Sequence, residues 1–148
     1  MANLDLGLEI TRPAKRRRYF TVAQANRSLV LVKRVVADVI LGYQDLLDLQ
    51  EMLEVSQVSG RNMQSCRARM QETVENLQNC LDELEEMGVE IRDWALGVVD
   101  FPAMADGREV LLCWQFGEPK VMYWHEMNAA DAGRQPIKTL PIEMPILT

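Results

Sequence analysis

The only histidine of the chain, His125, stands in the segment KVMYWHE, where two aromatic residues precede it and a carboxylate follows. A histidine can act as a general base near neutral pH when a carboxylate orients its ring and raises its pKa. In this chain Glu109 or Asp100 could orient the ring, and Arg108 or Arg134 could hold an anion. These residue types are therefore those of a small-molecule site or of an acid–base catalyst.

The same residues also raise the question of a metal site. His125 with Glu126, Asp100 and Glu109 would offer one nitrogen and several oxygen ligands. Zinc sites usually draw on more histidine and cysteine ligands than this chain supplies. The chain has three cysteines, at widely spaced positions: Cys66, Cys80 and Cys113. We interpret them as reduced, small, buried side chains, and we expect no metal and no cofactor.

Strand alternation predicts which side chains meet His125. If the chain turns at residues 117–118, His125 lies near the start of the previous strand, with Arg108 or Glu109 as its neighbour. Trp114 and Trp124 could line a ligand pocket there, although aromatic residues of a small sheet are more often core residues. The simpler interpretation of the histidine, which we favour, is a strand-end residue that hydrogen-bonds a carboxylate on the next strand.

Two long helices must position these strands. Thr21 and Gln24 form a capping box, which predicts a helix start. Apolar residues then recur at steps of three and four, with Gln50 as the one break: Val22, Ala25, Leu29, Val32, Val36, Val39, Tyr43, Leu46 and Leu53. After a break at residues 56–62 the same steps return: Met63, Cys66, Met70, Val74, Leu77, Leu81 and Leu84. This pattern predicts an antiparallel hairpin with a coiled-coil seam that ends at the cap residue Gly88.

After the hairpin the pattern alternates with period two. Asp106-Gly107 is a strong hairpin signal, and Pro102 indicates a strand edge or end. We predict an α+β fold, in which a long antiparallel helical hairpin (residues 19–88) precedes a small antiparallel β-meander of three or four strands (89–127). Residues 1–18 are expected to form a flexible basic arm, and residues 128–148 an extended, proline-containing tail.

Composition restricts the class of function. The net charge of −6 argues against general nucleic-acid binding, and the only basic candidate for it is the arm segment Lys15, Arg16, Arg17 and Arg18. The chain shows neither the basic start and apolar core of a signal peptide nor about 20 consecutive apolar residues. We therefore expect a cytoplasmic protein that does not enter membranes.

Apolar residues also lie beside the seam of the first helix: Leu31, Val35, Ile40 and Leu47. The sheet can cover part of this surface, and a second copy of the hairpin can cover the rest as a four-helix bundle. We expect a homodimer that acts as a non-enzymatic interaction or scaffold module, with a protein partner as a further option. The alternative is a small-molecule or metal-binding protein, or an enzyme, that uses the cluster around His125.

Several segments resemble a bacterial family of small proteins known as a domain of unknown function. They follow the patterns YFT-x-x-x-AN, GVEI-x-D, VDFPA, DGREV-x-LCW, GE and WHE, and cover most of residues 19–137. The chain differs at Val30, where the family commonly has a proline after the early leucine. The resemblance implies an uncharacterised bacterial, cytosolic protein and supplies no activity.

Overall fold

The computed structural model describes residues 18–55, 60–129 and 133–141. The fold is α+β, as the sequence predicts. Two helices, α1 (Val22–Val55) and α2 (Gly60–Met87), pack as a hairpin and precede a single sheet. Its strands are β1 (Glu90–Asp93), β2 (Val98–Ala105), β3 (Arg108–Gln115), β4 (Tyr123–Glu126) and β5 (Gln135–Pro136).

The predicted ends of the hairpin are confirmed. The amide of Gln24 donates to Thr21 Oγ1 (3.1 Å), and the amide of Thr21 donates to Gln24 Oε1 (2.9 Å). At the end of α2, Gly88 has a positive φ of 80°, which glycine adopts without strain. The amide of Val89 donates to the carbonyl of Leu84 at 2.9 Å, which closes the helix with a Schellman motif.

The seam between the helices is buried largely as predicted, with two differences. Leu49 is buried and fills the position between Leu46 and Leu53, so the seam has no break at Gln50. Met63, predicted in the seam of α2, is exposed and lies in the first turn of that helix.

The sheet is an antiparallel meander in the order β1-β2-β3-β4-β5. Asp106 and Gly107 both have positive φ, which confirms the predicted two-residue hairpin turn. The meander has one strand more than predicted, because Gln135 of the expected tail pairs with Trp124. Pro102 lies on an edge, since β1 pairs with β2 only as far as Asp100.

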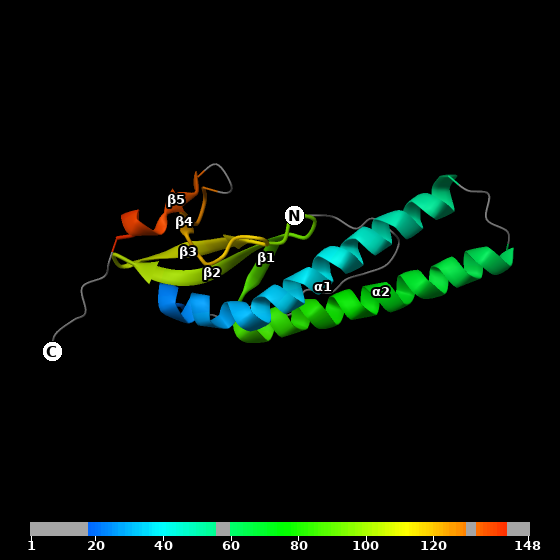
Figure 1. The fold of residues 1–148 in the computed structure, drawn as a ribbon, viewed down its shortest axis with the longest axis horizontal. Coiled ribbons are helices and arrows are strands. Elements are labelled where there is room, and N and C mark those ends of the chain that lie inside the picture. Colours follow the sequence, from blue (N-terminus) through cyan, green and yellow to red (C-terminus); the bar gives the residue numbers. More distant parts are fainter. Residues whose placement is uncertain (1–17, 56–59, 130–132, 142–148) are drawn as a thin grey trace.

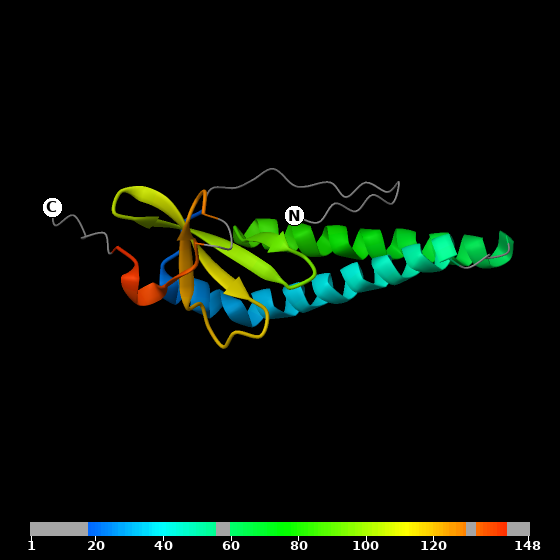
Figure 2. The ribbon, with the colours of Figure 1, turned by 90° about the horizontal axis from the view of Figure 1, so that it is seen from above.

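One face of the sheet packs on α1. Phe20, just before the helix, meets Phe101 edge to face with ring centroids 5.3 Å apart. Tyr43 meets Trp94 in the same way at 5.9 Å. Figures 1 and 2 show that the sheet covers one end of the hairpin, whereas the other end projects beyond it. Much of α1 and α2 is therefore covered by no strand.

The predicted basic arm lies mostly outside the described residues, as does the end of the tail (142–148). Arg18 is described and belongs to the fold. Its guanidinium lies 4.8 Å from the ring centroid of Phe20 and donates to the carbonyl of Met87 (3.3 Å). None of the described helices is both long enough and apolar enough to cross a bilayer.

Candidate functional site

His125 is almost fully buried, with 1% of its surface exposed. It lies on the outer face of the sheet, which we define as the face turned away from α1. Its cross-strand partner is Leu111, so the predicted pairing with Arg108 or Glu109 is wrong. The reason is the connection between β3 and β4. Residues 116–122 form a loop in place of a tight turn, and this shifts the register.

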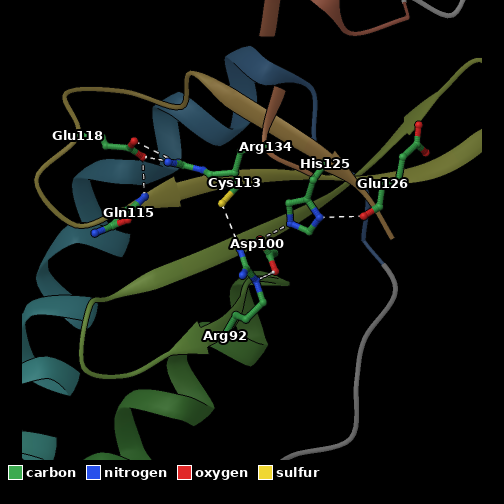
Figure 3. Close-up of polar contacts among 8 residues, drawn as sticks. All are labelled: Arg92, Asp100, Cys113, Gln115, Glu118, His125, Glu126 and Arg134. Carbon is green, nitrogen blue, oxygen red and sulfur yellow. Dashed lines mark hydrogen bonds and ion pairs between the residues drawn. The ribbon is translucent and has the colours of Figure 1, made fainter. Parts of the chain in front are cut away.

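Three strands, β1, β2 and β3, bring polar side chains to His125 of β4. Asp100 of β2 lies opposite Cys113 of β3, and Arg92 of β1 reaches both. Arg92 Nε donates to Asp100 Oδ2 at 2.9 Å, and Arg92 Nη2 donates to Cys113 Sγ at 3.3 Å. His125 Nε2 lies 3.2 Å from Asp100 Oδ1. Figure 3 shows these four side chains pointing toward one another, and we call them the outer-face cluster.

The partners of His125 fix its protonation. The carbonyl oxygen of Glu126 lies 2.8 Å from Nδ1 and can only accept, so Nδ1 carries a proton. The pKa of His125 is raised from 6.5 to about 10. The hydrogen bond to Asp100 is the largest cause and a hydrogen bond to Cys113 the next, whereas burial acts in the opposite direction. At neutral pH the ring is therefore an imidazolium that donates from both nitrogens, and not a free general base.

A second ion pair adjoins the cluster. Arg134 Nη2 donates to both carboxylate oxygens of Glu118, at 2.8 and 3.1 Å. The Arg134 guanidinium also lies 4.2 Å from the ring centroid of Tyr123. Glu118 in turn accepts from the amide of Gln115 at 2.7 Å. Figure 3 places Arg134 beside Cys113, so this predicted residue does belong to the neighbourhood of His125.

The other charged candidates lie elsewhere. Arg108 Nε and Nη2 donate to the two oxygens of Glu126, at 2.9 and 2.7 Å, in an exposed pair. Glu109 accepts from the hydroxyl of Tyr19 at 2.8 Å. Alternation separates these groups from the outer-face cluster: Glu126 lies on the opposite face from His125, and Glu109 is near the far end of β3.

The two tryptophans are core residues on the helix-facing side. The indole of Trp114 donates to the carbonyl of Glu118 (3.0 Å), and that of Trp124 donates to Thr139 Oγ1 (3.1 Å). Both rings are at least 97% buried. They therefore do not line a pocket beside His125, which the structure places on the other face.

Sequence reasoning missed Arg92 and Cys113. Cys113 looks like an ordinary small apolar residue in its strand, and Arg92 looks like a solvent-facing one. One signal was present, because the Asp106-Gly107 turn sets the register that puts Asp100 opposite Cys113. Asp100, Cys113 and His125 now form a group of metal-ligand types whose donor atoms lie within 4.8 Å of one another. This group shares only His125 and Asp100 with the set considered from the sequence, which also held Glu126 and Glu109.

Comparison with known proteins gives one match. A family model described as an uncharacterized conserved protein, DUF2203, matches residues 18–137. That segment spans both helices and all but the end of the described tail, and it includes the whole outer-face cluster. No curated protein and no solved structure matches the chain.

Proposed function

This chain belongs to the uncharacterised conserved protein family DUF2203, and we propose that it is a non-enzymatic module that self-associates through its helical hairpin. The observation that carries the proposal is a line of exposed residues on α1 whose spacing is symmetric about Leu41. It consists of Val30, Arg34, Leu41, Asp48 and Met52.

The apolar members of this line are well exposed. Val30 is 71% exposed, Leu41 69% and Met52 47%. Each is eleven residues from the next, and eleven residues make three helical turns with a remainder of about 20°. The three side chains therefore lie along one side of α1. Isolated exposed apolar residues are ordinary, but these three are aligned along one helix, where a second helix could bury them together.

The spacing suits a second copy of the same chain. An antiparallel pair of α1 helices with its two-fold axis at Leu41 brings Val30 against Met52 of the second copy. Arg34 and Asp48 stand seven residues before and after Leu41, so the same axis brings each opposite the other. The pairing thus matches apolar with apolar residues and a cation with a carboxylate. Asp48 also accepts from Gln44 on its own helix (3.1 Å), which holds it in place.

The surface beside Leu41 leaves room for such packing. A shallow groove of about 580 Å³ runs between α1 and α2, lined by Asp38, Leu41, Gly42, Asp45, Thr73, Asn76, Leu77, Asn79 and Cys80. Side chains of a second hairpin can enter it and complete a four-helix bundle. The outer-face cluster supports the non-enzymatic part of the proposal, because His125 is enclosed and protonated at neutral pH.

We also propose that the protein acts in the cytoplasm of a bacterium. The support is the sequence resemblance described above, together with the three free cysteines, which suit a reducing compartment.

Sedimentation equilibrium over a range of protein concentrations tests self-association. The wild type should reach twice the monomer mass, and Leu41→Asp should remain a monomer. Leu96→Asp is the matched control, because Leu96 is exposed in the turn between β1 and β2 and should leave the dimer intact.

Charge reversal tests the register. Arg34→Asp or Asp48→Arg alone places like charges opposite each other at two symmetric positions, which should weaken the dimer about tenfold or more. The double variant restores opposite charges and should recover most of the affinity. A wild type that stays monomeric, or a double variant as weak as the two single ones, would refute the proposal.

A further inference from the structure

We propose that Asp100, Cys113 and His125 form a binding site for a divalent transition-metal ion of the zinc class. The site is independent of the proposed dimer, because it lies on the outer face of the sheet, away from the exposed line of α1. The argument rests on donor atoms, their hydrogen bonds and their burial.

Three adjacent strands supply the three side chains. Asp100 and Cys113 are cross-strand partners in β2 and β3, and His125 of β4 lies opposite Leu111, two residues from Cys113. A carboxylate oxygen, a sulfur and an imidazole nitrogen thus come within 4.8 Å of one another. All three residues are at least 96% buried. Side chains held on paired strands keep their positions, which is the preorganisation that a metal site needs.

The contact between His125 and Asp100 needs a positive species between its two atoms. Nδ1 of His125 must donate to the Glu126 carbonyl, so in the neutral ring Nε2 presents a lone pair. That lone pair faces an Asp100 oxygen at 3.2 Å, which is also an electron-pair donor. Something positive must lie between them. In the metal-free protein it is a proton on Nε2, and a metal ion can replace that proton.

The surroundings support the three donors in the way that metal sites require. A ligating histidine usually donates its other N–H to a backbone carbonyl or carboxylate, as Nδ1 of His125 does to Glu126. Arg92 binds both oxygens of Asp100: Nε donates to Oδ2 at 2.9 Å and Nη2 to Oδ1 at 3.4 Å, while Oδ1 also faces His125 Nε2 at 3.2 Å. Arg92 Nη2 also donates to the Cys113 sulfur at 3.3 Å, which stabilises a sulfur that carries negative charge.

The donor types select the metal. Sulfur with imidazole and one carboxylate suits Zn²⁺ or Co²⁺, whereas Mg²⁺ and Ca²⁺ prefer oxygen alone. The divalent ion would replace two protons, the one on Nε2 and the one of the Cys113 thiol. The charge of the cluster would therefore stay the same. Arg92 keeps its positive charge beside the ion, so it limits the affinity of the site.

Cobalt titration of the full-length, metal-stripped protein, prepared without a histidine tag, tests the site. Co²⁺ should bind at one equivalent and give a thiolate-to-cobalt charge-transfer band in the near ultraviolet, and Zn²⁺ should displace it. Cys113→Ser should abolish the band, while His125→Gln and Asp100→Asn should each weaken binding at least tenfold. Cys66→Ser and Glu109→Gln are matched controls outside the cluster and should bind as the wild type does.

A second measurement needs no variant and stays valid if Cys113→Ser fails to fold. His125 is the only histidine, so its two ring nitrogens give one pair of ¹⁵N signals. Addition of Zn²⁺ should move Nε2 from a protonated to a metal-bound chemical shift and leave Nδ1 protonated. Unchanged ring shifts at saturating Zn²⁺, or a cobalt band that survives Cys113→Ser, would overturn the proposal.

Discussion

Loss of the contact between Asp100 and His125 should cost the metal-free protein a large part of its stability. The two charged groups are 3.2 Å apart. Their attraction at an effective dielectric constant of about 20 is about 5 kcal/mol. The rise in the pKa of His125 from 6.5 to about 10 corresponds to about 5 kcal/mol, and the hydrogen bond to Asp100 is its largest cause, ahead of those to Cys113 and the Glu126 carbonyl. A typical domain has only about 5–15 kcal/mol of total stability, so the contact matters.

The sign of the pH dependence follows from the direction of the shift. The folded state raises the pKa of His125, so its stabilising effect is complete below the unfolded value of 6.5. The effect decreases as the pH rises from there and is lost above about pH 10. The groups that face His125 in this window are the Asp100 carboxylate, the Arg92 guanidinium and the Cys113 sulfur.

Urea unfolding in the presence of a chelator, from pH 6 to 10, measures this effect. The wild type, Asp100→Asn, His125→Gln and the double variant form a cycle whose coupling free energy at pH 7 should be about 3–5 kcal/mol. The difference in unfolding free energy between the wild type and His125→Gln should shrink as the pH rises. A difference that stays constant across this range, or a coupling below about 1 kcal/mol, would refute the reasoning.

Two further predictions concern packing and thiol reactivity. Gly97→Ala should lower the unfolding free energy by about 2–4 kcal/mol in the same assay. The reason is that φ of Gly97 is +71° and the new Cβ would lie 2.7 Å from Ile40 Cδ1. A loss below about 1 kcal/mol would contradict this. The pKa of Cys80 is raised to about 11, mainly by burial and next by the charge of Asp38. The alkylation rate of Cys80 at pH 8 should therefore be about 100-fold below that of the unfolded chain. Mass spectrometry of the alkylated peptide checks this, and a rate that levels off below pH 10 would contradict it.

The helical hairpin could be predicted because its signals are local. The three- and four-residue steps of the seam, the Thr21–Gln24 capping box and the cap at Gly88 each depend on residues close together in the chain. Backbone geometry alone converts such spacing into a buried face. The Asp106-Gly107 turn is local in the same sense, because two residues with positive φ close the hairpin by themselves.

The candidate site could be predicted only in part. His125, Asp100 and Arg134 can be named from their residue types, but the structure places the side chains of Glu109, Arg108 and Glu126 outside the outer-face cluster. The reason is the register in which β4 pairs with β3. A shift of one or two residues in that register places each side chain of β4 beside different residues. That register depends on the loop of residues 116–122. The amide of Val121 donates to Asn26 Oδ1 at 2.7 Å, which ties this loop to a helix 95 residues earlier in the chain.

The sequence by itself therefore determined the helices, the Asp106-Gly107 turn and the residue types that can do chemistry, since each depends on neighbours along the chain. Only the tertiary structure decided which of those residues meet. Cys113 becomes a candidate ligand, and Arg92 a hydrogen-bond donor to it, because four paired strands bring them to His125 and Asp100. Contacts of this kind join side chains that are far apart in sequence, and no local sequence pattern indicates the distances between them.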